Sequence, residues 1–159
     1  MIQSMTAALG INPADEAIFV GPLGIRFLVT GDDSHGSAAV FECTVPAGEK
    51  LRAPAHRHDA YEETIYGMDG VLTWTVNGQP IAVAPGQALC IPRGAVHRFD
   101  NLGQEDAKSL IIVSPALIGP AYFREVAAAM AAAAGGPPDQ TLMADIMRRH
   151  GLTPAPPGG

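Results

Sequence analysis

Long apolar runs, basic charge and aromatic side chains are all scarce in this chain of 159 residues. No stretch reaches the roughly 18 consecutive apolar residues of a transmembrane helix, so we expect no membrane span. Acidic residues outnumber lysine and arginine by 16 to 10, which gives a net charge of −6. This charge argues against nucleic acid or an anionic membrane surface as a partner, because both attract a basic face.

Cysteine is also rare, with only Cys43 and Cys90, each inside an apolar run. Free cysteine is among the most buried residue types, so we expect two buried, reduced thiols. The first ten residues lack the basic start and the long apolar stretch of a secretory signal. These features together favour a reducing, bacterial-type cytoplasm as the location.

Turn-forming residues, in contrast, are plentiful, with 18 glycines and 14 prolines in a chain that is 47% hydrophobic. Short β-rich runs recur about every 8–12 residues, separated by turn signals such as Asp69-Gly70 and Asn77-Gly78. This spacing predicts an all-β sandwich or barrel.

Composition divides the chain into four parts. Residues 1–15 have no clear period and are expected to form an N-terminal arm, and residues 16–115 the β-barrel domain. Residues 116–153 predict a helical extension, with an alanine-rich helix at Tyr122–Ala134 and a second helix at Gln140–His150. Residues 154–159 form a Pro/Gly tail.

Three of the five histidines lie in the middle third of the chain, near a pair of glutamates. On a strand, His56 and His58 present both imidazoles on the same face, with Arg57 on the other. Glu63 follows across a short turn, and an antiparallel barrel could bring His97 back alongside. Three imidazoles and one carboxylate form a good ligand set for a transition metal.

Each of these residues also has an ordinary interpretation. A lone His97 could be an unremarkable strand or turn histidine, a His-x-His pair can lie on a surface, and Glu62 with Glu63 could be a solvated charge pair. Adjacent residues of a strand face opposite ways, so only one of the two glutamates is expected to point inward.

The spacing of these residues resembles the two sequence motifs of the cupin family. The first is carried by Gly48, His56, His58, Glu63 and Gly70, and the count of six residues before Gly70 selects Glu63 over Glu62. The second is met at every spacing, by the residues Gly86, Pro92, Gly94, His97 and Asn101. One departure is that seven residues, not five, separate Gly48 from His56, which indicates a longer turn before the ligand strand.

The resemblance implies a double-stranded β-helix, or jelly-roll barrel, whose lumen holds a metal on His56, His58, Glu63 and His97. It is closest to small single-domain bacterial cupins described as quercetin 2,3-dioxygenase-like. Strand parity then predicts which apolar residues line a substrate pocket beside the metal: Phe41, Cys43, Ile65, Leu72, Trp74 and Phe99.

In that family such a site holds Fe, Mn, Ni, Cu, Co or Zn, and many members are dioxygenases. The resemblance therefore implies oxidation of a small flavonol-, catechol- or enol-like substrate, with Glu63 doubling as a base. Two alternatives stay open: redox-neutral isomerase, lyase or cyclase chemistry, and non-catalytic binding of a small ligand or metal. The family resemblance also implies a homodimer.

Overall fold

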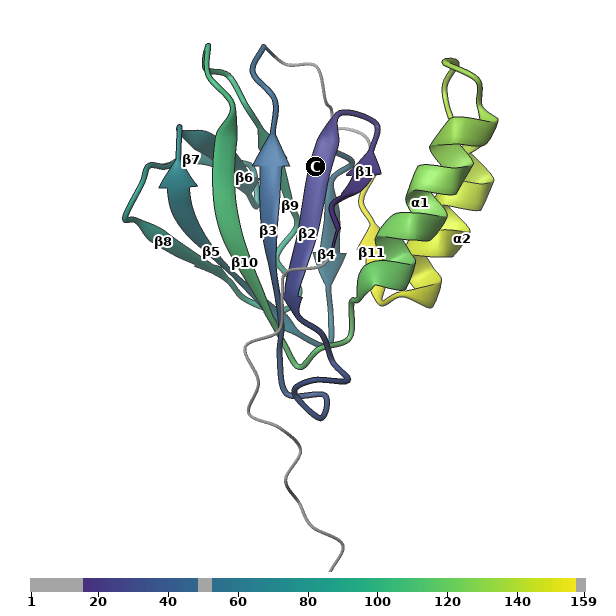
Figure 1. The fold of residues 1–159 in the computed structure, drawn as a ribbon, viewed down its shortest axis with the longest axis horizontal. Helices are drawn as coiled ribbons and strands as arrows, with labels where there is room; N and C mark the ends of the chain where they lie inside the picture. The colour runs from purple at the N-terminus through teal and green to yellow at the C-terminus, as the bar shows by residue number, and fades with distance from the viewer. Residues whose placement is uncertain (1–15, 49–52, 157–159) are drawn as a thin grey trace, which may run out of the picture.

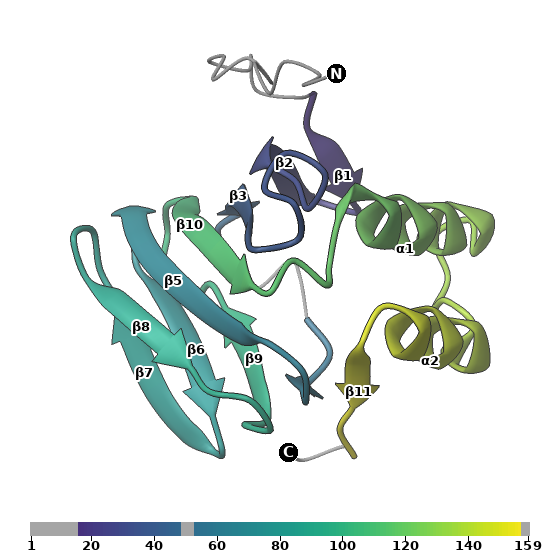
Figure 2. The ribbon, with the colours of Figure 1, turned by 90° about the horizontal axis from the view of Figure 1, so that it is seen from below.

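The computed structural model describes residues 16–48 and 53–156, so the expected N-terminal arm and the last three residues lie outside the described residues. Within them, the strands form two antiparallel sheets that face each other (Figures 1 and 2). The six-stranded sheet has the order β1 (Ile18–Val20), β2 (Leu23–Val29), β3 (Ala39–Val45), β10 (Ala107–Ser114), β5 (Glu62–Asp69) and β8 (Ala88–Ile91). The five-stranded sheet has the order β11 (Leu152–Pro154), β4 (His56–His58), β9 (His97–Asp100), β6 (Leu72–Val76) and β7 (Gln79–Val83).

The core lies between the sheets because apolar residues alternate along the strands. In β10, every second residue is buried, from Ala107 through Ile111 to Val113, while the residues between them face outward. The opposite sheet contributes Leu72 and Trp74 from β6 to the same core. Burial of one face per strand is what period-two patterning produces.

Two helices follow the barrel. Helix α1 (Pro120–Ala132) begins with a proline, which suits the first turn, and α2 (Gln140–Arg149) is capped by Asp139. The Asp139 carboxylate accepts hydrogen bonds from the backbone N–H groups of Thr141 and Leu142, at 2.8 and 3.0 Å.

The helices connect one edge of each sheet. Helix α1 packs on β1, the edge of the six-stranded sheet, and α2 packs on β11, the edge of the five-stranded sheet. The helices also pack on each other, so the pair bridges the two sheets along one side of the barrel (Figure 2). The C-terminal segment is therefore a wall of the barrel.

Two glycines of the motifs occupy turns that require a positive φ. Gly70 has a φ of 64°, and a Cβ atom there would lie 2.6 Å from the Asp106 carbonyl oxygen. Gly94 has a φ of 79°, and its N–H donates to the His58 carbonyl oxygen at 2.7 Å. This bond ties the turn before His97 to the strand that carries His58.

The jelly-roll prediction with a C-terminal helical extension is confirmed, and two details differ from the sequence-based expectation. Strand β11 was not predicted, and it begins directly after α2, so Pro154 belongs to the sheet and not to a tail. Cys43 is buried as expected, but Cys90 is exposed, because it faces outward from the edge strand β8. Across the described residues, no helix is both long and apolar enough to cross a membrane.

Candidate metal centre

The three histidines of the two motifs meet inside the barrel. Strands β4 and β9 are antiparallel neighbours in which His56 pairs with His97, and the two ring centroids lie 4.6 Å apart. The His58 ring lies 4.8 Å from that of His56 and 4.9 Å from that of His97. One nitrogen from each of the three rings lies within 4.8 Å of the other two, so the three could hold a metal ion together.

The neighbouring glutamates point to opposite sides of β5. The Glu62 carboxylate lies at the surface and pairs with Arg93 at 2.7 Å. Glu63 is buried, and its Oε2 accepts hydrogen bonds from Nε2 of His58 at 3.0 Å and from Nε2 of His97 at 3.1 Å. The prediction that Glu63, and not Glu62, faces inward is therefore confirmed.

Backbone carbonyl groups orient two of the imidazoles. The Nδ1–H of His56 donates to the Pro54 carbonyl oxygen, and that of His97 donates to the Ala95 carbonyl oxygen, each at 2.9 Å. A proton held on Nδ1 leaves Nε2 of His56 as the nitrogen that can bind a metal. This is the usual arrangement around a metal-ligating histidine. To bind a metal in the same way, His97 would first have to give up the Nε2 proton that it donates to Glu63.

Burial and proximity set the charges of the cluster. Burial alone would raise the pKa of Glu63, but the hydrogen bonds from His58 and His97 outweigh it and hold the pKa far below its usual range. Burial, with the neighbouring imidazoles, lowers the pKa of His56 to about 3. Burial also opposes the charged form of His97, but its hydrogen bond to Glu63 raises the pKa overall. One ionised carboxylate thus sits among imidazoles.

This donor set fits a divalent first-row metal. Neutral imidazole and carboxylate are the ligands that Fe, Mn, Co, Ni, Cu and Zn accept, and the Nδ1 anchor of His56 leaves its Nε2 free for the ion. His56, His58, Glu63 and His97 are the residues that would hold it. The identity of the metal does not follow from the ligands, because affinity order and supply decide among these ions.

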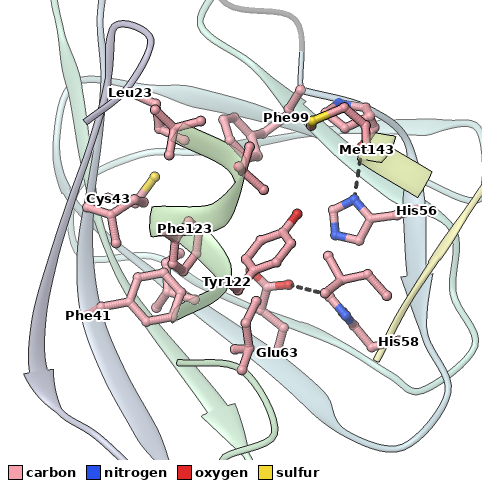
Figure 3. Close-up of a pocket in the computed structure, with 18 of the residues that line it drawn as sticks. Leu23, Phe41, Cys43, His56, His58, Glu63, Phe99, Tyr122, Phe123 and Met143 are labelled. Carbon is pink, nitrogen blue, oxygen red and sulfur yellow. Dashed lines mark hydrogen bonds and ion pairs between the residues drawn. The ribbon is translucent and has the colours of Figure 1, made fainter. Parts of the chain in front are cut away.

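A cavity of about 440 Å³ opens beside the cluster, with His56, His58 and Glu63 at one end (Figure 3). Its walls are mostly apolar and come from both sheets and both helices. A volume of this size is typical of sites for small organic ligands. His97 is almost fully buried and does not reach the cavity wall.

Four of the six residues predicted for the pocket do line this cavity, namely Phe41, Cys43, Trp74 and Phe99. Ile65 and Leu72 are buried on the inner face, as their parity predicts, but the cavity does not extend to them. Alternation along a strand fixes the face on which a side chain lies, but not its distance from the open side of the barrel. That part of the pocket prediction is corrected.

The residues that sequence reasoning missed come mainly from the helices and the first two strands. Tyr122, Phe123, Val126 and Met130 of α1 and Met143 of α2 all line the cavity. The four-residue spacing of Met143 and Met147 is typical of a helix face that packs against the barrel or a partner subunit, and it gives no sign that Met143 faces a cavity. Tyr61, directly before β5, does not line the cavity and is fully buried, with its ring centroid 4.3 Å from that of His58.

Comparison with known proteins identifies the family. The model of the cupin domain family matches residues 41–113, the segment that carries all four candidate ligands. The chain contains a cupin domain at residues 41–113. Among solved structures, this cupin is similar in fold to KdgF from Halomonas sp., with a TM-score of 0.55 and 17% identity over 64% of this chain and 86% of that one.

An RmlC-like cupin from Shewanella frigidimarina is similar in fold to the same degree, with a TM-score of 0.55 and 17% identity over 64% of this chain and 84% of that one. Quercetin 2,3-dioxygenase from Bacillus subtilis is 30% identical over 107 residues, which are 61% of this chain and 31% of that protein. This cupin spans 31–42% of the length of the curated relatives that it matches.

Proposed function

We propose that this cupin is a metal-dependent dioxygenase of a small, largely apolar compound that carries an enol or phenol oxygen. The observation that carries the proposal is the position of three histidines and an ionised glutamate beside a mostly apolar cavity of about 440 Å³. The similarity to a quercetin 2,3-dioxygenase supports an oxygenase over other cupin activities. A bound redox-active metal would supply the coordination of substrate oxygen and of dioxygen.

Glu63 is the candidate base. Its carboxylate lines the cavity and is ionised at neutral pH, so it can accept the proton of a substrate hydroxyl group, although the hydrogen bonds from His58 and His97 that lower its pKa also weaken it as a base. His58 and His97 fix the carboxylate through Oε2, which keeps it aimed at one end of the cavity. The deprotonated oxygen of the substrate would then face the metal ligands.

The walls of the cavity exclude water from the bound ligand. Phe41, Phe123 and Phe99 are among the side chains that enclose it, and aromatic walls favour a ligand that is flat and apolar. Removal of water also strengthens the electrostatic interaction between an ionised substrate oxygen and the ligand cluster.

The proposal is tested by oxygen uptake. The protein, purified without chelators and analysed for metals, is reloaded separately with Fe, Mn, Co, Ni, Cu or Zn and offered a flavonol, a catechol and a β-diketone in an oxygen electrode. We expect at least one redox-active form to consume oxygen in proportion to the substrate lost. If no form consumes oxygen while the zinc form converts or binds a compound, the redox-neutral or binding function replaces the dioxygenase.

Substitution of the two adjacent glutamates tests the role of the base. Glu63→Gln is expected to lower the rate of oxygen uptake per bound metal by about 100-fold or more, because a general base contributes about that much. Glu62→Gln is the matched control, since Glu62 faces outward and pairs with Arg93. Equal rates for the two variants would remove Glu63 from the mechanism.

A further inference from the structure

We infer that Tyr122, on the first turn of α1, is a substrate-positioning residue whose hydroxyl group binds a second oxygen of the ligand. The first oxygen of that ligand lies at the end of the cavity formed by His56 and Glu63. The cavity would therefore select compounds with two neighbouring oxygen atoms over compounds with one. This inference rests on the proposed function, because it concerns the ligand of the same cavity.

The first observation is where the hydroxyl group points. Tyr122 is buried, lines the cavity, and directs its hydroxyl oxygen toward the imidazole of His56 (Figure 3). Figure 3 draws no hydrogen bond between this hydroxyl group and any of the lining residues shown. A hydroxyl group that faces a cavity, with no hydrogen bond to the lining residues drawn around it, is within reach of a ligand.

The second observation is that Tyr122 differs in polarity from the residues around it in the cavity wall. Among the described residues that line the cavity, Tyr122 carries the only hydroxyl group. Phe123, Val126 and Met130, on the same helix, present only carbon or sulfur atoms to the cavity. A hydroxyl group in a mostly apolar wall gives direction to ligand binding, because a ligand that leaves it unpaired loses a hydrogen bond in a dry environment. The wall also holds the indole N–H of Trp74 and the amide of Gln140, but only a hydroxyl group can both donate and accept through one atom.

The third observation concerns the proton. Burial, together with the negative charge of Glu63, raises the pKa of Tyr122, so its hydroxyl group stays protonated. It can therefore donate to a carbonyl or phenolate oxygen of the ligand, while the Glu63 carboxylate, which lines the same cavity, can accept a hydrogen bond from the other oxygen. The two groups have complementary roles toward a ligand with one acceptor oxygen and one acidic hydroxyl group.

The ring of Tyr122 is held in place by the helix pair. It packs edge-on against Phe123, with centroids 5.0 Å apart, and its centroid lies 5.5 Å from that of His150. His150 itself hydrogen-bonds Glu125 of α1 at 2.9 Å, so the residue beside Tyr122 is tied across the two helices. The C-terminal helices would thus set which ligand the metal centre receives.

The test compares two probe ligands on three forms of the metal-replete protein. Nitrocatechol offers two neighbouring oxygens and nitrophenol offers one, and both report binding by a change in absorbance. The forms are the unmodified protein, Tyr122→Phe, and Tyr66→Phe as a matched control, because Tyr66 is exposed on the outside of β5. Metal content is measured for each form.

We expect Tyr122→Phe to weaken nitrocatechol binding about tenfold, the effect of one buried hydrogen bond, and to leave nitrophenol binding and metal content unchanged. Tyr66→Phe should change neither affinity. Equal nitrocatechol affinity in Tyr122→Phe and the unmodified protein would overturn the inference and leave the proposed function standing. Equal weakening of both probes would also overturn it, because that is the signature of a purely structural role.

If the unmodified protein binds no nitrocatechol, the inference also fails. The proposed function is then judged separately, by oxygen uptake with the other substrates. The failure of one proposal is therefore distinguishable from the failure of the other.

Discussion

The His56-Arg57-His58 tripeptide offers a direct comparison of inward and outward side chains on one short strand. His56 and His58 face the ligand cluster, whereas Arg57 is exposed and pairs with Asp59 at 2.9 Å. Alternation alone produces this division, so the orientation of all three side chains could be predicted from the sequence. The choice between Glu62 and Glu63 could not come from alternation, because it depends on which parity the strand adopts, and the count to Gly70 decided it.

Loss of one imidazole should empty the metal site. His97→Ala removes a buried candidate ligand and leaves Glu63 with one histidine partner, so we expect most of the bound metal to be lost. Arg57→Ala, on the outer face of the ligand strand β4, should retain its metal. Elemental analysis of the two purified variants is the measurement, and unchanged occupancy in His97→Ala would show that the ligand assignment is wrong.

At the scale of elements, a charged cluster joins three neighbouring strands of the larger sheet. Glu42 of β3 pairs with Arg26 of β2 at an N–O distance of 2.6 Å and with Lys108 of β10 at 3.2 Å. Burial opposes the charged form of Glu42, but the hydrogen bonds from Arg26 and Lys108 outweigh it and lower its pKa. The cluster thus stabilises the folded state only while Glu42 is ionised.

The lowered pKa of Glu42 determines how the contribution of this cluster to stability changes with pH. The contribution of Glu42 is fully present above its unfolded-state pKa, near 4.5, and is lost as the pH falls through the lower folded-state value. We expect Glu42→Gln to reduce the free energy of unfolding at neutral pH by about 0.5–1 kcal/mol, with the difference shrinking below pH ~4. Urea denaturation at neutral pH and below pH ~4 measures the difference in the free energy of unfolding between the variant and the unmodified protein. A difference that grows in acid would contradict the stabilising role of ionised Glu42.

Most strands could be predicted from turn signals and alternation, including the segments that became β3, β6, β7 and β8. Strand β11 could not, because its three residues include Pro154 and gain their partner only from β4, which is far away in the sequence. For the same reason the helices could be predicted as helices but not as a wall of the cavity. Propensity and capping act locally, whereas the surface that a helix covers depends on tertiary packing.

For the whole molecule, the helix pair is expected to be less stable than the barrel beside it. Helices α1 and α2 pack against edge strands and each other, whereas β10 has a partner strand on both sides. Two contacts join the helices to each other: Glu125 of α1 pairs with Arg149 at 2.7 Å and with His150 at 2.9 Å. Within α2, Arg149 also pairs with Asp145 at 3.0 Å.

Hydrogen exchange of the backbone amides measures the difference in stability between the helix pair and the barrel. Backbone amides of α1 and α2 should exchange faster than those of β10, and Glu125→Gln should speed exchange in the helices by about two- to fivefold while β10 stays unchanged. Glu105→Gln, in the turn before β10, is a control that removes the same charge away from the helices. A uniform change across the chain on Glu125→Gln would contradict the division into a stable barrel and a looser wall.

Part of the cavity wall lies outside the stretch of sequence that carries the metal ligands. All four candidate ligands lie within residues 41–113, the family domain, while Tyr122, Met130 and Met143 lie beyond it. Substitutions in residues 116–150 can therefore alter which compound is accepted without touching the imidazoles or the carboxylate. For evolution and for engineering alike, this arrangement makes ligand preference and metal chemistry two traits that can change independently.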